Sequence, residues 1–237
     1  MTIVDGAHTT LDIPYWGAIV AATFSVRLIL IPVSIFQQQQ VARVAIMQPE
    51  NDALREKYIN NPEFNNSEEL RLKYMEETRA LMAKHGCNPL RTLSLPLLQL
   101  PIFLSFFTGL RGMPNYFPDL SSGGMLWFQD LCAADTTYAL PILNALLFLS
   151  IVELGGNENK AAPPQQVKTM KNVLRCLAAI TVPATAGFSQ ALQLYWFANN
   201  SFSVAQTLVL KQERVRSYFN IPKIPSKAHS TSTKESK

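Results

Sequence analysis

Apolar runs alternate with polar segments along this chain, and five of the runs approach the length of a membrane span. A spanning helix needs about 20 mainly apolar residues. The runs cover residues 16–36, 92–110, 138–154, 173–188 and 192–210, and the third and fourth are short for a full crossing. The pattern predicts an all-α polytopic membrane protein with five transmembrane helices.

Polar side chains interrupt these runs at helical spacing. Arg27 lies near the centre of the first run, where an arginine costs about 2.5–3.5 kcal/mol on insertion scales. Thr23 shares its helix face, and Asn199, Ser203 and Gln206 form a polar stripe on the last run. We therefore expect one polar cavity that these helices share. The alternative is that the polar residues only hold helices together and that Arg27 is paired for packing.

Residues 37–88 carry a near-balanced mixture of charges and belong in water. Their periodicity predicts a helical hairpin. The first helix should run from about 38 to 59, bend at Pro49 and stop at Asn60-Asn61-Pro62. The second should start at an Asn66 or Ser67 cap and close at His85-Gly86. Two solvated helices that merely connect spans remain the alternative.

Proline and glycine mark the other boundaries. Pro32 should kink the far end of the first span, because it lacks an N–H and crowds the preceding turn. Residues 115–137 form a turn-rich loop whose amphipathic tip, 125–128, is expected in the membrane interface. Residues 155–166 are a Gly/Asn/Pro-rich linker. Beyond Leu210 the chain is basic and polar, and its Ser/Thr/Lys-rich end is expected to be disordered.

The basic residues give the orientation. With five spans, all but Arg27 and Arg111 of the 21 Lys and Arg residues fall on one side. The positive-inside rule then places the N-terminus outside and the hairpin, linker and tail inside. The domains are an outer segment 1–15, a five-helix domain 16–210 that includes the hairpin, and a basic tail 211–237. Such a tail attracts anionic lipid or RNA phosphate.

The reactive residues argue against an enzyme. His8, His85 and His229 lie outside all the predicted spans, so an intramembrane catalyst lacks its usual groups. The 3 cysteines have neither metal-ligand spacing nor an even number, and no metal or disulfide framework is expected. A channel or small-solute carrier could use the same polar cavity and is kept as an alternative.

Several short motifs, in this order and spacing, resemble the YidC/Oxa family of membrane-protein insertases. They are Trp16-Gly17 with Arg27 and Pro32, Gln48-Pro49-Glu50, Asn88-Pro89-Leu90, LPLLQLPIFLSFF at 95–107, the Trp127-to-Leu131 loop followed by Leu140-Pro141, and Leu194-Tyr195-Trp196-Phe197-x-x-Asn200. Glu153-Leu154-Gly155 and Gly123-Gly124 are closer to the mitochondrial Oxa branch than to the bacterial one. The related branch for cytochrome oxidase assembly is the nearest rival. The tail is short beside the ribosome-binding tails of the Oxa branch, and residues 1–15, which contain no Lys or Arg, do not have the composition expected of a presequence.

The resemblance implies an insertase that needs no nucleotide or other cofactor. Its helices would enclose a hydrophilic groove that is closed towards the outside. The resemblance places Arg27 in that groove, and we expect the full set of substrate-groove residues to be Arg27, Thr23, Gln99, Asn199, Ser203 and Gln206. The expected partner-binding residues of the tail are Lys211, Arg214, Arg216, Lys223 and Lys227. Nascent membrane proteins are the implied substrates, in the mitochondrial inner membrane with the N-terminus in the intermembrane space and the C-terminus in the matrix. The mitochondrial ribosome and anionic lipid are the expected partners of the tail, and a homo-oligomer is left open.

Overall fold

The described part of the chain is helical, which confirms the all-α prediction. The computed structural model describes residues 2–88, 94–156 and 164–224, in which β-pairing is limited to isolated bridges. The α-helices are α1 (Thr2–Leu11), α2 (Tyr15–Ile29), α3 (Ile31–Ile59), α4 (Glu68–Lys84), α6 (Ser94–Gly112), α7 (Ala139–Gly156), α8 (Pro164–Thr185), α9 (Gln190–Lys211) and α10 (Glu213–Tyr218). Two 3₁₀ turns, η1 (Met113–Asn115) and η2 (Pro118–Ser122), follow α6.

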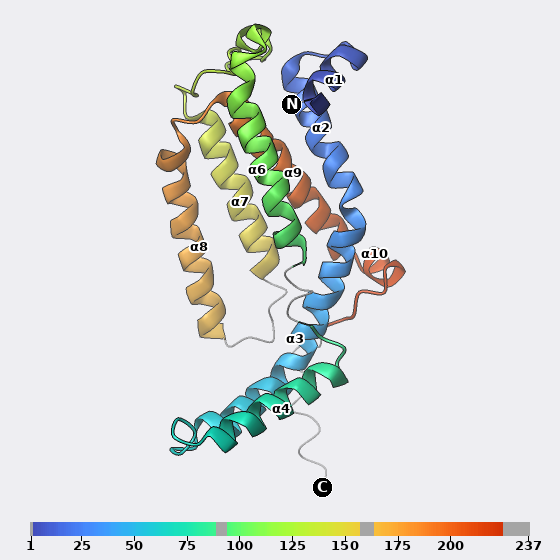
Figure 1. Cartoon of the computed structure of the whole chain (residues 1–237), viewed down its shortest axis with the longest axis vertical. Coiled ribbons are helices and arrows are strands. Elements are labelled where there is room, and N and C mark those ends of the chain that lie inside the picture. The colour runs from blue at the N-terminus through green and yellow to red at the C-terminus, as the bar shows by residue number, and fades with distance from the viewer. Residues whose placement is uncertain (1, 89–93, 157–163, 225–237) are drawn as a thin grey trace.

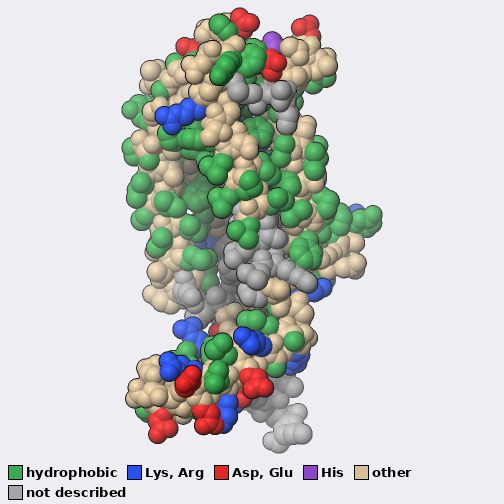
Figure 2. Space-filling view, in the orientation of Figure 1, with side chains coloured by type: hydrophobic (Ala, Val, Ile, Leu, Met, Phe, Trp, Pro, Cys, Tyr) green, Lys and Arg blue, Asp and Glu red, His purple; other side chains and the backbone are tan. Residues whose placement is uncertain are grey.

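The helices α2, α6, α7, α8 and α9 run side by side as a bundle (Figure 1). Helix α9 packs against α2, α6 and α7, while α8 packs against α7. One end of the bundle, called here the loop end, carries α1 and residues 113–138; the other, the hairpin end, carries α4. On the face shown in Figure 2, charged side chains gather over the hairpin, and the bundle above it is mainly hydrophobic.

Helix α2 ends at Ile29, and α3 starts at Ile31 in a new direction, at a bend of 53°. Pro32 lies in the first turn of α3, where its missing N–H does no harm, while in a continuous helix its ring would clash with the carbonyl of Leu28. This confirms the predicted kink. The predicted boundary at Gln37 is wrong, because α3 passes without a break from the first apolar run into the hairpin and continues through Pro49.

Among the described helices, none is by itself both long and apolar enough to cross a membrane; by length and composition, the bent pair of α2 and α3 together meets these criteria. The five-span topology stays a prediction.

The hairpin of α3 and α4 closes as predicted. Helix α3 ends at Ile59, Ser67 caps α4 by accepting a hydrogen bond from the Leu70 N–H at 3.3 Å, and Gly86 leaves α4 with a φ of +60°. Across the hairpin, Lys84 donates to Glu50 at 2.7 Å, and both Lys57 and Tyr58 donate to Glu77. The hydrogen bond from Lys84 lowers the pKa of Glu50, and those from Tyr58 and Lys57 lower the pKa of Glu77.

One other predicted boundary is wrong. Helix α8 begins at Pro164 rather than at 173, so the end of the predicted linker is helical; proline suits a first helical position because it needs no N–H there. The start of the tail is ordered: α10 is followed by Ile221, which is 4% exposed and packs on Ala42 of α3 and Leu210 of α9. The Ser/Thr/Lys-rich end, for which disorder is expected, falls within residues 225–237, Lys227 among them, which lie outside the described residues.

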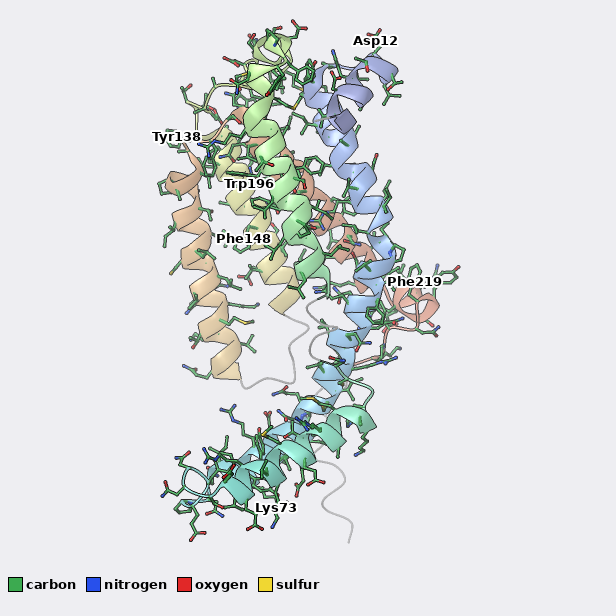
Figure 3. The ribbon with its side chains drawn as sticks, viewed as in Figure 1. Asp12, Lys73, Tyr138, Phe148, Trp196 and Phe219 are labelled. Atoms are coloured by element: carbon green, nitrogen blue, oxygen red, sulfur yellow. The ribbon has the colours of Figure 1, made fainter. Side chains whose placement is uncertain are left out.

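The loop end is tightly joined to the bundle. Trp16 N–H at the start of α2 donates to Gly123 O at 2.9 Å, and Gln190 N–H at the start of α9 donates to Ala133 O at 2.8 Å. The loop thus satisfies N–H groups that helix starts leave free. Gly124 is required, since a Cβ there would overlap the carbonyl oxygen of Phe128. The chain turns at this end at Asp12 and Tyr138, whose φ angles are 52° and 58° (Figure 3).

Asp135 holds this loop to the start of α7. Its carboxylate accepts hydrogen bonds from the Leu140 N–H at 2.7 Å and from the Thr137 hydroxyl at 2.6 Å. Burial acts to raise the pKa of Asp135, but the hydrogen bonds from Thr137 and Leu140 outweigh it and lower that pKa. In the predicted loop tip, Leu126 and Trp127 are exposed while Phe128 is buried.

Candidate functional site

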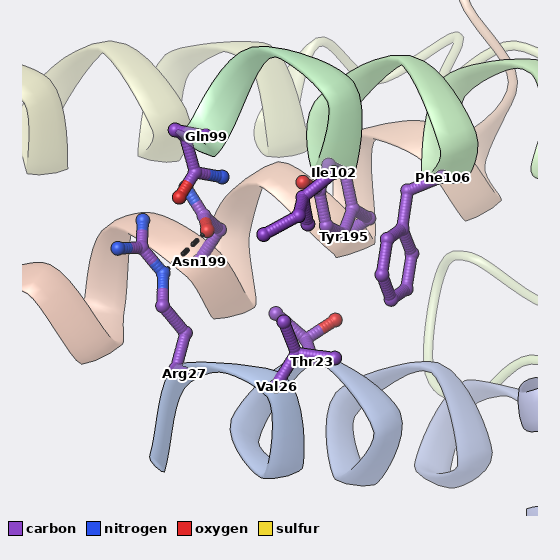
Figure 4. A pocket seen from close by; sticks show the side chains of 8 residues that line it. All are labelled: Thr23, Val26, Arg27, Gln99, Ile102, Phe106, Tyr195 and Asn199. Carbon is purple, nitrogen blue, oxygen red and sulfur yellow. Dashed lines mark hydrogen bonds between the residues drawn. The ribbon is translucent and has the colours of Figure 1, made fainter. Parts of the chain in front are cut away.

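A small open pocket, whose empty space of about 190 Å³ includes open solvent, lies between α2, α6 and α9 (Figure 4). Its lining combines polar and apolar side chains from the three helices: Thr23, Val26, Arg27, Gln99, Ile102, Phe106, Tyr195 and Asn199. Of the six predicted groove residues, the structure therefore brings Thr23, Arg27, Gln99 and Asn199 to one place. Whether this pocket binds a substrate stays a prediction.

Arg27 lies in the last turn of α2, three residues before Leu30, and is half-buried. Its Nε–H donates to Asn199 Oδ1 at 2.7 Å, which turns the guanidinium towards α9 (Figure 4). No carboxylate among the described residues forms a salt bridge with it. The buried Thr23, one turn earlier, donates its hydroxyl to Ile19 O at 2.7 Å and so adds no free donor.

Two other polar atoms at the pocket have no hydrogen-bond partner within the described structure: Oε1 of Gln99 and the hydroxyl oxygen of Tyr195. Tyr195 is 2% exposed, and its ring stacks on Phe106 with 4.6 Å between centroids. Gln99 points from α6 towards Asn199 and Arg27 (Figure 4). Buried polar atoms in native proteins are almost always paired. These two oxygens therefore mark the pocket as a place for a hydrogen-bonding group.

Ser203 and Gln206 do not line this pocket. The hydroxyl of Ser203 donates to Asn199 O at 2.9 Å, within α9, and Gln206 is half-buried farther along the helix. Their predicted contribution to a substrate groove stays a prediction.

A polar network between α7 and α9 was missed in the sequence. Asn144 of α7 donates to both the carbonyl and the side-chain oxygen of Gln193 at 3.0 Å, and Gln193 donates to Thr185 O at 2.7 Å. Asn144 and Gln193 are buried, with 7% and 0% exposure. Their isolated positions inside apolar runs were the available signal. All their bonds are to neighbouring helices, so the network holds the bundle together.

Several charges at the hairpin end are paired. Glu153 at the end of α7 binds Lys171 at 3.1 Å and Arg175 at 2.5 Å, both on α8. In the tail, Lys211 donates to Leu154 O and Arg216 donates to Pro222 O, while Lys223 lies 3.8 Å from Glu213. Arg214 is exposed. The ordered part of the predicted partner-binding tail is thus largely engaged within the molecule.

Comparison with known proteins gives a consistent result. A model of the family described as 60Kd inner membrane protein matches residues 7–217. The mitochondrial inner membrane protein OXA1 of Arabidopsis thaliana is 32% identical over 94% of this chain and 51% of its own length. The OXA1 of Saccharomyces cerevisiae is 33% identical over 94% of this chain and 54% of its own length. OXA1L of Mus musculus is 32% identical over 93% of this chain and 50% of its own length. The chain spans about half the length of the curated relatives it matches.

Proposed function

The chain belongs to the 60Kd inner membrane protein family, which is the YidC/Oxa family, and we propose that it inserts nascent hydrophobic proteins into the mitochondrial inner membrane. The names of its relatives, which are mitochondrial inner membrane proteins OXA1 and OXA1L, support this location and the Oxa branch. Neither nucleotide nor another cofactor takes part in the proposed mechanism.

The observation that carries the proposal is the half-buried Arg27 in a pocket shared by three helices. A polar tail that must cross a membrane loses its hydration, and each unpaired polar group then costs several kcal/mol, of the order of 2–7. A pocket that offers a guanidinium, two carboxamides and a hydroxyl replaces part of that hydration. The tail then crosses a shorter apolar distance, and the barrier to insertion falls.

The substrate's apolar helix is proposed to enter lipid beside α7 and α9. Both helices expose large apolar side chains, among them Ile142 and Leu146 on α7 and Leu208 and Val209 on α9. Hydrogen bonds join residues 113–138 to α2 and α9 at the loop end, and we propose that this end is closed to the substrate. The tail of the substrate would therefore enter from the hairpin end.

The hairpin end is proposed to face the matrix. It carries the basic side chains of α4, the start of α8 and the tail, and Figure 1 shows these elements at the same end of the bundle. The positive-inside rule assigns such an end to the inner compartment. The N-terminus would then lie in the intermembrane space. The mitochondrial ribosome is the proposed partner of residues 225–237.

The test is reconstitution of the full chain into liposomes that contain anionic lipid, without nucleotide. A single-span reporter with a short acidic tail is added, and protease protection of the tail measures insertion. We expect protection well above that of protein-free liposomes. Insertion no better than in protein-free liposomes would contradict the proposal, and a steady ionic current without insertion would favour a channel.

A further inference from the structure

We propose that Gln99 and Tyr195 form a subsite for a main-chain peptide group of the substrate's polar tail. The inference rests on the proposed function and adds a substrate chemistry to it. It starts from the two buried oxygens that have no partner in the described structure, Gln99 Oε1 and the Tyr195 hydroxyl, which lie on the same pocket as Arg27.

The chemistry of the two groups selects the ligand. A carboxamide oxygen only accepts hydrogen bonds, so it attracts an N–H and repels a carboxylate. A phenolic hydroxyl that has no acceptor can donate to a carbonyl oxygen. A peptide group presents both an N–H and a C=O. In the subsite its N–H donates to Gln99 Oε1, and its C=O accepts from Tyr195.

The subsite binds a different kind of chemical group from the one that Arg27 binds. Arg27 carries a full charge, is anchored by Asn199, and favours anionic groups. Gln99 and Tyr195 are neutral and favour a group that every non-proline residue carries. A tail without acidic residues can therefore use the pocket, because its peptide groups are partnered where water is excluded. This gives the pocket a means of accepting tails of different sequence.

The surroundings of Tyr195 allow a clean substitution. Its ring stacks on Phe106 at an interplanar angle of 9° and is nearly inaccessible, so Tyr195→Phe keeps the packing and removes one oxygen. Gln99→Leu keeps the approximate shape and removes the carboxamide. Tyr15→Phe is the matched control: Tyr15 is also buried in the core but lies at the loop end, away from the pocket.

The experiment uses reconstituted full chain and two reporters with neutral tails. One tail is rich in glycine; the other has sarcosine in its place, so its amides keep C=O but lack N–H. Rates are corrected for protein-free liposomes. Wild type should insert the glycine tail about 2- to 10-fold faster than the sarcosine tail, the effect of one neutral hydrogen bond. Gln99→Leu should abolish that preference. Tyr195→Phe should slow both tails by a similar factor, and Tyr15→Phe should change neither.

The outcomes separate the two proposals. If wild type inserts neither tail nor the acidic reporter above protein-free liposomes, the proposed function fails. If wild type inserts them but shows no preference between glycine and sarcosine, or if Gln99→Leu and Tyr195→Phe behave as wild type, the peptide subsite is overturned while the insertase function stands.

Discussion

Removing the charge of Arg27 should slow insertion of acidic tails far more than it destabilises the fold. The guanidinium has one described partner, Asn199, at 2.7 Å, and no acidic one. A substrate carboxylate at 4 Å would gain about 4 kcal/mol at an effective dielectric constant of about 20. Desolvation of that carboxylate offsets part of the gain. A net of roughly 1.5–3 kcal/mol corresponds to a rate effect of about 10- to 150-fold.

The assay is a double-mutant cycle between protein and reporter. Wild type and Arg27→Ala are each tested with an acidic tail and with its neutral Asn/Gln counterpart. We expect Arg27→Ala to slow the acidic tail by at least about 10-fold and the neutral tail much less, with Arg27→Lys intermediate because it keeps the charge but not the fork of donors. Arg111→Ala, at the loop end of α6, is the matched control and should behave as wild type.

Folding is measured on the same samples. Loss of the Arg27 side chain leaves Asn199 Oδ1 without its donor, a penalty of about 1–3 kcal/mol that thermal unfolding in detergent reports. Arg27→Gln can restore a neutral donor to Asn199. It should recover the stability of the fold but not the insertion rate of the acidic tail. The reasoning is refuted if folded Arg27→Ala inserts the acidic reporter at the wild-type rate.

Amide hydrogen exchange should be faster at the hairpin tip, residues 60–66, than in α9, because the tip is a largely exposed run of turns; equal protection would contradict this. Deleting residues 225–237 should weaken cosedimentation with mitochondrial ribosomes at low salt and slow cotranslational insertion while the bundle stays folded; unchanged ribosome binding would point to anionic lipid instead. Asp135→Asn should lower the free energy of unfolding by about 1–3 kcal/mol, because Thr137 and Leu140 donate to different carboxylate oxygens and the NH₂ group that replaces one of them cannot accept a hydrogen bond. Since the folded pKa of Asp135 is lowered, its contribution should be present above the usual value of 3.8 and be lost at lower pH, and melting curves across pH would check both points.

Local signals in the sequence predict the hairpin well and the helix limits in the bundle less well. Ser67 and Gly86 act on their own turns, so cap chemistry alone places the ends of α4. By contrast, the glutamines at 37–40 suggest a boundary where there is none, because a helix can pass from an apolar to a polar medium without interruption. Ile221 is ordered through tertiary contacts with Ala42 and Leu210, which composition does not reveal.

The candidate site shows the same division. Helical spacing places Thr23 with Arg27 and puts Asn199, Ser203 and Gln206 on one stripe. Helical spacing does not show which part of that stripe packs beside α2 and α6. Of the three residues, only Asn199 lines the pocket. Tyr195 counts as one more apolar position in the sequence. Its importance emerges only when α6 brings Phe106 and Gln99 against it.

The break at Leu30 separates α3 from α2, so α3 can change its angle to the bundle as one long helix. Helix α3 has 29 residues at about 1.5 Å each, so its length from Leu30 to the hairpin tip is roughly 44 Å. If α3 rotates as a rigid helix by about 10° around Leu30, the hairpin tip moves by roughly 8 Å. Gln39, about 13 Å from Leu30 along the helix, moves by only roughly 2 Å. The tail contacts α3 in the part nearer to Leu30: Gln39 donates to Phe219 O at 2.8 Å, and Ile221 packs on Ala42. For a rigid rotation of α3 about Leu30, the displacement of the hairpin tip is therefore about threefold that of Gln39.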